Sequence, residues 1–174
     1  EAIQFFFTHL STQNLDQLIS WGGLTVLTVI VFSETGLLVG FFLPGDSLLV
    51  TAGVIAARGH LDLATMIIVL CLAAVIGDAV GYSLGYKIGP KIFTREDSMF
   101  FKKSHLIKTK EFYEKYGGKT IILARFVPII RTFAPFIAGV AQMNYSKFAI
   151  YNITGGVSWI TSMAMIGYYI GNRF

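Results

Sequence analysis

Five ionisable side chains lie inside apolar stretches of this sequence, where charge is unusual. The acids fall in the first half of the chain and the bases in the second: Glu34, Asp46, Asp78, Arg125 and Arg131. A charge at the centre of a membrane-spanning helix costs roughly 2.5–3.5 kcal/mol on insertion scales. The sequence therefore predicts compensating contacts, and we expect Glu34 and Asp46 to meet the two arginines.

Two interpretations of these charges are open. In the first they are structural ion pairs, whose disruption from one side strongly destabilises a protein. In the second they handle a substrate, because arginine suits two-pronged phosphate recognition and free backbone N–H groups at helix breaks bind anions. Arg125, Arg131 and the Thr132 hydroxyl would then hold an anionic headgroup. Glu34 and Asp46 would exchange protons or release the arginines, since burial favours the protonated acid and a nearby arginine the ionised one.

Asp78 is assigned instead to helix packing or to a bond with a neighbouring helix. It follows the first member of a stripe of glycines spaced four residues apart, which are Gly77, Gly81, Gly85 and Gly89. Small residues at this spacing let a second helix approach closely in a membrane.

The elements that carry these residues are those of a membrane protein. The chain has 174 residues, of which 54% are hydrophobic and 14% charged, and its mean hydropathy is +0.64. Soluble domains carry about 25% charged residues. The ranges 24–43, 63–88 and 148–170 are apolar and long enough to span a bilayer. With a single cysteine, Cys71, this sequence forms no internal disulfide.

Two further apolar stretches are short or interrupted. The range 47–57 is too short to cross a bilayer, and the range 120–142 contains prolines and arginines. Proline removes a backbone donor and breaks a helix, so both stretches are predicted to belong to re-entrant or broken helical hairpins. The predicted breaks are Pro44, Gly45, Pro128 and Pro135.

The stretch between the two halves is strongly basic. It holds nine of the 14 basic residues: Lys87, Lys91, Arg95, Lys102, Lys103, Lys108, Lys110, Lys115 and Lys119. Basic loops face the cytoplasm, and they also attract anionic lipid headgroups. Nucleic acid is not predicted as a partner, because the loop is short and tethered to the membrane.

The two halves share a spaced pattern. A shift of 86 residues brings Ala52-Gly53-Val54 onto Ala138-Gly139-Val140, and Gly81-Tyr82 onto Gly167-Tyr168. With the basic loop in the cytoplasm, the two halves would have opposite orientations, and inverted repeats with broken helices are typical of transporters. A simple stack of four or five spanning helices is the alternative.

We therefore predict an all-α integral membrane fold in one domain, residues 1–174. It comprises an interfacial helix over 1–22, a first repeat over 23–89, a basic cytoplasmic loop over 90–118 and a second repeat over 119–174. Each repeat is a re-entrant or broken helical hairpin followed by a spanning helix. Because the sequence begins at Glu1 rather than Met and ends directly after an apolar run, we expect it to be a piece of a longer chain.

The motifs resemble those of the DedA family of membrane proteins, within the wider VTT (SNARE-associated Golgi protein) group. The resemblance covers nearly the whole chain from about Leu24 onward. It rests on Glu34 upstream of Phe42-Leu43-Pro44-Gly45-Asp46-Ser47, on Arg125-Phe126-Val127-Pro128 followed by Arg131-Thr132, and on Ala138-Gly139 and Gly167-Tyr168.

This resemblance implies two re-entrant hairpins that face each other in the membrane, with essential positions at Glu34, Asp46, Arg125 and Arg131. It also implies movement of lipids between leaflets, including the return of undecaprenyl phosphate in bacteria, and dependence on the proton-motive force. Members of the family usually carry one further C-terminal apolar helix, which is not in this sequence.

The sequence thus predicts a multi-pass lipid transporter, or flippase, of a bacterial inner membrane, whose partner is a phospholipid or polyprenyl phosphate. No enzymatic activity, metal or cofactor is predicted, because the histidines are scattered and no nucleophile has a base beside it. Two other functions stay open: a proton-driven antiporter for a small ion or drug, and a non-transporting membrane assembly factor. A homo-oligomer also stays open.

Overall fold

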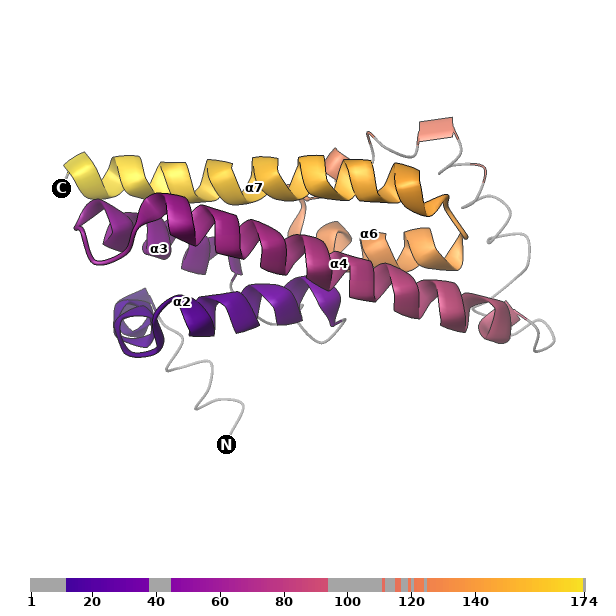
Figure 1. The fold of residues 1–174 in the computed structure, drawn as a ribbon, viewed down its shortest axis with the longest axis horizontal. Helices are drawn as coiled ribbons and strands as arrows, with labels where there is room; N and C mark the ends of the chain where they lie inside the picture. Colours follow the sequence, from indigo (N-terminus) through magenta and orange to yellow (C-terminus); the bar gives the residue numbers. More distant parts are fainter. Residues whose placement is uncertain are drawn as a thin grey trace.

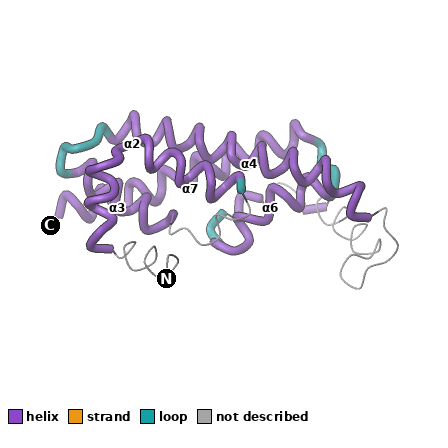
Figure 2. Tube along the Cα trace, turned by 90° about the horizontal axis from the view of Figure 1, so that it is seen from below, coloured by secondary structure: helices purple, strands orange, loops and turns teal. Residues whose placement is uncertain are grey.

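The fold of the chain is a bundle of helices. The computed structural model describes residues 12–37, 45–93, 111, 115–116, 119, 121–123 and 125–173. The main helices follow one another in the order α2, α3, α4, α6 and α7 (Figure 1). Every regular element in the described ranges is a helix (Figure 2), which confirms the predicted all-α class.

Helix α2 spans Thr12–Gly36 and bends sharply at Gly23, where φ is 56° and ψ is −155°. Residues with a Cβ atom rarely adopt such a backbone conformation. The part of α2 before the bend is seen end-on in Figure 1, whereas the part after it runs along the long axis of the molecule. Residues 1–11 lie outside the described residues, so the interfacial position of the helix predicted over 1–22 stays a prediction.

Of the apolar stretch predicted over 24–43, the structure describes the part up to Leu37, and α2 ends at Gly36. The apolar part of α2, Gly22–Gly36, is among the shorter apolar helices of 10–17 residues. At a rise of about 1.5 Å per residue, such a helix falls short of a hydrocarbon core about 30 Å thick. Glycine is a common residue at the end of a helix. Residues 38–44, which include the predicted break at Pro44, lie outside the described residues.

Helices α3 and α4 follow the prediction closely. Helix α3 covers Gly45–Ala57 and has 13 residues. Helix α4 covers Leu63–Phe93, and Asp62 caps it by accepting the Thr65 backbone N–H at 2.7 Å. Within α4, Leu63–Gly89 is the one described stretch that is both long and apolar enough to span a bilayer. Most of the basic loop predicted over 90–118 lies outside the described residues.

Helix α6 covers Pro128–Val140, so it begins at one of the predicted breaks. The break predicted at Pro135 is wrong, because this proline lies inside α6. Membrane helices tolerate an internal proline where neighbouring helices pack around it. Here Gly81 of α4 leaves the room, since a Cβ atom at Gly81 would come to 3.6 Å from Pro135.

Helix α7 covers Tyr145–Arg173 and has 29 residues, so it contains the helix predicted over 148–170. It is long enough to cross a bilayer but less apolar than α4. Helices α4 and α7 run in opposite directions (Figure 1).

The short helix of each half packs on the long helix of the other half: α3 lies against α7, and α6 lies against α4. Glycines permit both close approaches. A Cβ atom on Gly53 or Gly167 would collide with the facing backbone of α7 or α3, and one on Gly85 or Gly139 with that of α6 or α4. The glycine stripe of α4 therefore has the packing role predicted from its spacing.

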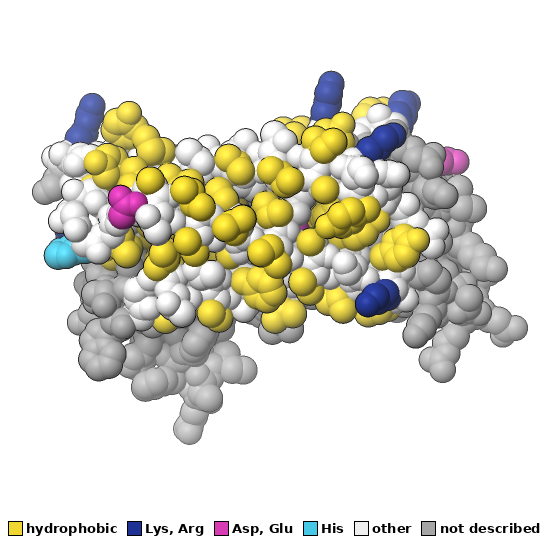
Figure 3. Space-filling model, in the orientation of Figure 1, with side chains coloured by type: hydrophobic (Ala, Val, Ile, Leu, Met, Phe, Trp, Pro, Cys, Tyr) yellow, Lys and Arg dark blue, Asp and Glu magenta, His cyan; other side chains and the backbone are white. Residues whose placement is uncertain are grey.

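The outside of the bundle is apolar. Ile68, Leu72 and Ile76 form one stripe on α4, and their side chains are 60%, 57% and 54% exposed. Figure 3 shows hydrophobic side chains spread along the middle of the face in view. Large contiguous apolar surfaces mark contact with a partner or a membrane. This surface fits the membrane assignment made from composition.

Candidate functional site

Three helix ends meet inside the bundle and bring opposite charges together. Glu34 lies near the end of α2, Asp46 in the first turn of α3 and Arg131 in the first turn of α6. The Arg131 guanidinium donates one hydrogen bond to Glu34 Oε1 and another, at 2.7 Å, to Asp46 Oδ1. The side chains of Arg131 and Glu34 are 3% and 4% exposed. The predicted meeting of both acids with Arg131 is therefore present.

Local sequence explains how these three helix ends come so close. Gly45 begins α3, and a Cβ atom at this position would collide with the Glu34 carboxylate. Pro128 begins α6 at a position where its missing N–H removes no helical hydrogen bond. Arg131 then follows within the first turn of α6. Asp46 benefits from the partial positive charge at the start of α3.

Trp159 of α7 completes this cluster. Its indole N–H donates to Asp46 Oδ1 at 2.9 Å, and its ring centroid lies 4.2 Å from the Arg131 guanidinium carbon. Cation–π contacts contribute about 0.5–2 kcal/mol, with the larger values at desolvated sites. Trp159 is fully buried, so it orients the arginine and one of its acids together.

Asp46 is the member of this cluster that is partly exposed at the surface of the bundle. Its side chain is 34% exposed, whereas that of Arg131 is 3% exposed. Thr132, next to Arg131, is buried. A group that approaches Arg131 from outside the bundle therefore meets Asp46 first.

A second ion pair lies fully inside the bundle. Arg125 sits in the turn before α6, and its Nη2 donates to Asp78 of α4 and to Asn152 of α7. Asn152 also donates from Nδ2 to the Val75 carbonyl at 3.0 Å. A Cβ atom at Gly155 would lie 3.3 Å from Arg125 Nε. Glycine in α7 thus leaves room for the arginine between the two long helices.

The two clusters together contain three carboxylates and two guanidiniums, a surplus of one negative charge when all five groups are ionised. Each cluster also keeps one carboxylate oxygen and one guanidinium nitrogen without a hydrogen-bond partner among the described residues. These atoms are Glu34 Oε2, Arg131 Nε, Asp78 Oδ1 and Arg125 Nη1. An unsatisfied buried polar group costs about 1–3 kcal/mol, and more when charged. Both clusters therefore retain hydrogen-bonding capacity for a further group.

Comparison with known proteins places the chain in a family. The VTT domain model matches residues 43–169. Protein DedA of Escherichia coli K12 is 48% identical over 148 residues, which are 84% of this chain and 68% of that protein. The chain belongs to the DedA family.

Other DedA-family relatives agree with this assignment. An uncharacterized membrane protein of Mycobacterium tuberculosis is 47% identical, over 84% of this chain and 65% of that protein. Inner membrane protein YqjA of Escherichia coli K12 is 34% identical, over 84% of this chain and 66% of that protein. No solved structure matches the chain. The relatives confirm the predicted family and the predicted location in a bacterial inner membrane.

Arg125 does not contact Glu34 or Asp46, so the predicted partners of this DedA-family residue are wrong. It pairs instead with Asp78 of α4, the residue assigned to packing. The reason lies in helix geometry, because successive residues point about 100° apart around a helix. Gly77 faces Thr35 of α2, whereas Asp78 points to Arg125 and the α7 side of the bundle.

Asn152 and Trp159 were not among the predicted site residues. Asn152 carried a usable signal, since a polar amide inside a membrane helix usually bonds to a neighbouring helix. Nothing in the sequence pointed to Trp159, because a tryptophan in an apolar helix looks like an ordinary packing residue.

Proposed function

We propose that this DedA-family protein moves an anionic lipid phosphate, such as undecaprenyl phosphate or a related lipid, between the leaflets of the bacterial inner membrane. Arg131 carries the proposal. Its guanidinium is buried, points its two terminal nitrogens at two carboxylates and lies where helix ends meet. The same two nitrogens can bind two phosphate oxygens in place of the carboxylates.

Arg131, rather than Arg125, is proposed as the main contact of the headgroup. Arg125 is held between two helices by a fully buried acid and an amide, Asp78 and Asn152. One of the acids paired with Arg131, Asp46, is partly exposed. A ligand can therefore replace Asp46 on Arg131 with a smaller loss of free energy than it could replace Asp78 on Arg125. Arg125 then acts as a positioning residue that sets where α6 begins.

The helix arrangement supports two inverted repeats. The shift of 86 residues pairs α3 with α6 and α4 with α7. The paired long helices run in opposite directions, and each short helix packs on the long helix of the other half. Inverted repeats with a site between them are a common design for alternating access. Movement of one half against the other would expose Arg131 to each face in turn.

The charge balance supports coupling to protons. The clusters already hold one negative charge more than positive, and a phosphate would add to this surplus. A charge that is buried without compensation is strongly unfavourable. We therefore infer that Glu34 or Asp46 takes up a proton when the phosphate replaces it on Arg131.

Reconstitution of the full chain in liposomes tests the proposal, with exposure of undecaprenyl phosphate on each face as the measurement. We expect Arg131→Ala to abolish movement. Arg131→Lys should be slower by at least about tenfold, which corresponds to about 1.5 kcal/mol for one lost charged hydrogen bond, because an ammonium group cannot make the two-pronged contact. Arg58→Lys is the matched control, since Arg58 is exposed and lies outside both clusters.

Two outcomes would contradict lipid transport by this mechanism. One is wild-type movement no faster than that of empty vesicles. The other is full activity of Arg131→Lys, which would leave two-pronged phosphate recognition without support.

The surplus of negative charge favours one alternative, the proton-driven antiport of a small cation or drug. Glu34 and Asp46 would then bind the proton and the cation in turn, and Arg131 would serve only as their counter-ion. Proton flux induced by a cation in vesicles that contain no undecaprenyl phosphate or other anionic lipid would support antiport. It would count against the proposed function.

A further inference from the structure

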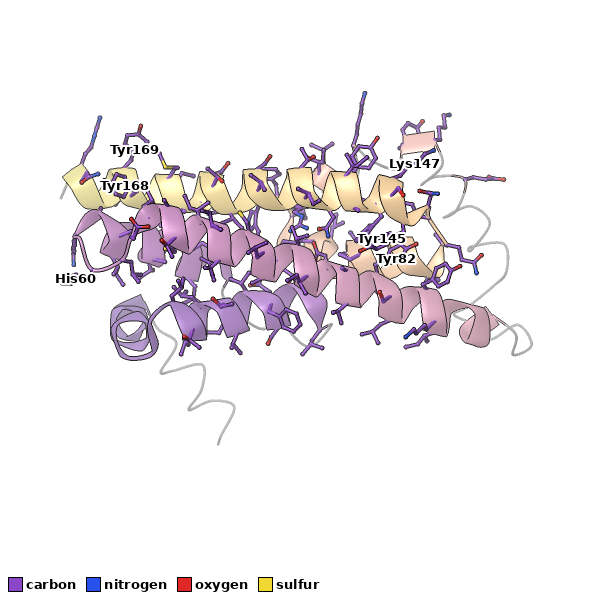
Figure 4. The ribbon with its side chains drawn as sticks, in the orientation of Figure 1. His60, Tyr82, Tyr145, Lys147, Tyr168 and Tyr169 are labelled. Atoms are coloured by element: carbon purple, nitrogen blue, oxygen red, sulfur yellow. The ribbon has the colours of Figure 1, made fainter. Side chains whose placement is uncertain are left out.

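A separate cavity lies at one end of the bundle, away from both charged clusters. Its volume is about 390 Å³, and its lining residues are Tyr82, Tyr86, Gln142, Met143, Asn144 and Tyr145. They come from α4, from the short connection between α6 and α7, and from the first residue of α7. Figure 4 labels Tyr82 and Tyr145 together at this end, with Lys147 beside them and His60, Tyr168 and Tyr169 at the opposite end.

The walls of this tyrosine cavity are held by specific contacts. The Tyr82 hydroxyl donates to the Met143 carbonyl, and the Tyr82 ring stacks on Phe148 with centroids 4.5 Å apart. The Tyr145 ring lies 5.4 Å from that of Tyr82 and is tilted by 60° to it. Gln142, in the connection after α6, has a φ of 55°, a left-handed conformation. The cavity is therefore a built feature of the connection between α6 and α7.

The chemistry of the lining favours a particular kind of ligand. The six lining side chains are uncharged and consist of three phenols, two amides and a thioether. The faces of aromatic rings carry negative potential and attract ammonium groups, which is the usual basis of ammonium recognition by aromatic residues. Phenol and amide groups supply hydrogen bonds around such a cation. A ligand with a negative charge alone would find no cationic side chain in the lining.

The position of the cavity connects it to lipid. The apolar stretch of α4 ends at Gly89, so Tyr82 lies about 10 Å and Tyr86 about 4.5 Å inside that end along the helix. Tyrosine is enriched at the boundary between hydrocarbon and headgroups, and Tyr86 lies close to that boundary. On α6, the exposed side chains Ile130, Phe133 and Ile137 form an apolar stripe that runs toward the cavity. A lipid with its headgroup in the cavity can therefore lay an acyl chain along α6.

We propose that the tyrosine cavity binds the headgroup of a membrane phospholipid that bears an ammonium group, such as ethanolamine, with the ammonium against the tyrosine rings. The site shares no residue with the two charged clusters. It is independent of whether the protein transports a lipid phosphate, and binding can be measured without transport.

Native mass spectrometry of the purified full chain tests this proposal. The protein is incubated with equal amounts of phosphatidylethanolamine and phosphatidylglycerol that carry identical acyl chains. We expect retention of one ethanolamine lipid in preference to the glycerol lipid. The double variant Tyr86→Ala/Tyr145→Ala should retain about five- to tenfold less of it, as expected for the loss of cation–π contacts.

Two controls separate the cavity from general effects. Tyr169→Ala removes a tyrosine that is 64% exposed at the other end of the molecule, and it should leave retention unchanged. Tyr86→Phe/Tyr145→Phe keeps both rings, so it should retain most of the binding. Tyr86 and Tyr145 are 49% and 53% exposed, so neither is itself a buried core residue.

A competition experiment needs no variant. Tetramethylammonium added to the wild-type protein should displace the retained ethanolamine lipid. The proposal is overturned by equal retention of the glycerol lipid, by an unchanged double alanine variant or by a lack of displacement.

Discussion

The two buried arginines of this chain differ in how completely the protein encloses them. Arg125 lies between α4 and α7, and its partner Asp78 is 1% exposed. Arg131 shares Asp46, whose side chain is 34% exposed. Removal of one member of a fully enclosed pair leaves a charge that neither water nor protein compensates. The ion pair of Arg125 and Asp78 is therefore expected to stabilise the packing of α4 against α7.

This difference predicts the effect of removing Asp78. Asp78→Ala should lower the free energy of unfolding by about 3–5 kcal/mol, because Arg125 stays buried without its partner. The double variant Asp78→Ala/Arg125→Met removes both charges and should recover most of that loss. Thermal unfolding of the purified protein in detergent measures both effects. Asp62→Asn, an exposed cap at the start of the same helix, is the control and should change little.

A double variant as unstable as the single one would argue against a stabilising role of the Arg125–Asp78 ion pair. So would an Asp78→Ala protein that unfolds at the wild-type temperature.

The sequence predicted one cluster and missed the other for a physical reason. Glu34, Asp46 and Arg131 lie within three residues of a glycine or proline at a helix end, so the sequence itself marks where they meet. Arg125 lies in a turn, and its partner depends on which faces of α4 and α7 point toward that turn. Those faces are set by packing between distant segments, which periodicity within one helix does not reveal.

The spacing between helices is set by glycines in this fold. Gly139 of α6 faces the backbone of α4 at Tyr82 so closely that a Cβ atom would collide with it. Gly81 of α4 lies in the same interface, but a Cβ atom there would make an ordinary contact at 3.6 Å. The spacing of four residues therefore predicted the packing face of α4 correctly. It could not show which glycines on that face have no room for a Cβ atom. Pro135 shows the same limit, since its contact with the helix at Gly81 depends on how α4 and α6 pack.

Two alanine substitutions test this ranking at the scale of helix packing. Gly139→Ala should destabilise the protein by about 1–3 kcal/mol, as overpacked interfaces do. Gly81→Ala should be neutral or slightly stabilising, because alanine favours helix by about 1 kcal/mol over glycine. The temperature at which the purified protein loses its monodisperse elution profile gives the comparison. Equal stability of the two variants would refute close backbone approach as the property that requires glycine at position 139.

At the scale of the whole molecule, the fold has two chemically different ends. His60 follows α3 at one end, and Lys147 lies in the first turn of α7 at the other (Figure 4). Lys87 lies near the last turns of α4, before the basic stretch of the sequence. Basic segments are retained in the cytoplasm, so the end with Lys147 should be cytoplasmic. Opposite locations of His60 and Lys147 follow if α4 and α7 both cross the bilayer.

Cysteine labelling in intact cells checks this topology. Cys71, the single cysteine, is first replaced by alanine, and cysteines are then introduced one at a time as His60→Cys, Lys147→Cys and Tyr169→Cys. A membrane-impermeant maleimide added outside should label positions 60 and 169, and position 147 should react only after the membrane is opened. Positions 147 and 169 lie on the same helix, so their opposite labelling requires α7 to cross the bilayer. Labelling of both from the same side would place α7 along one face, and the inverted arrangement of the two halves would then be lost.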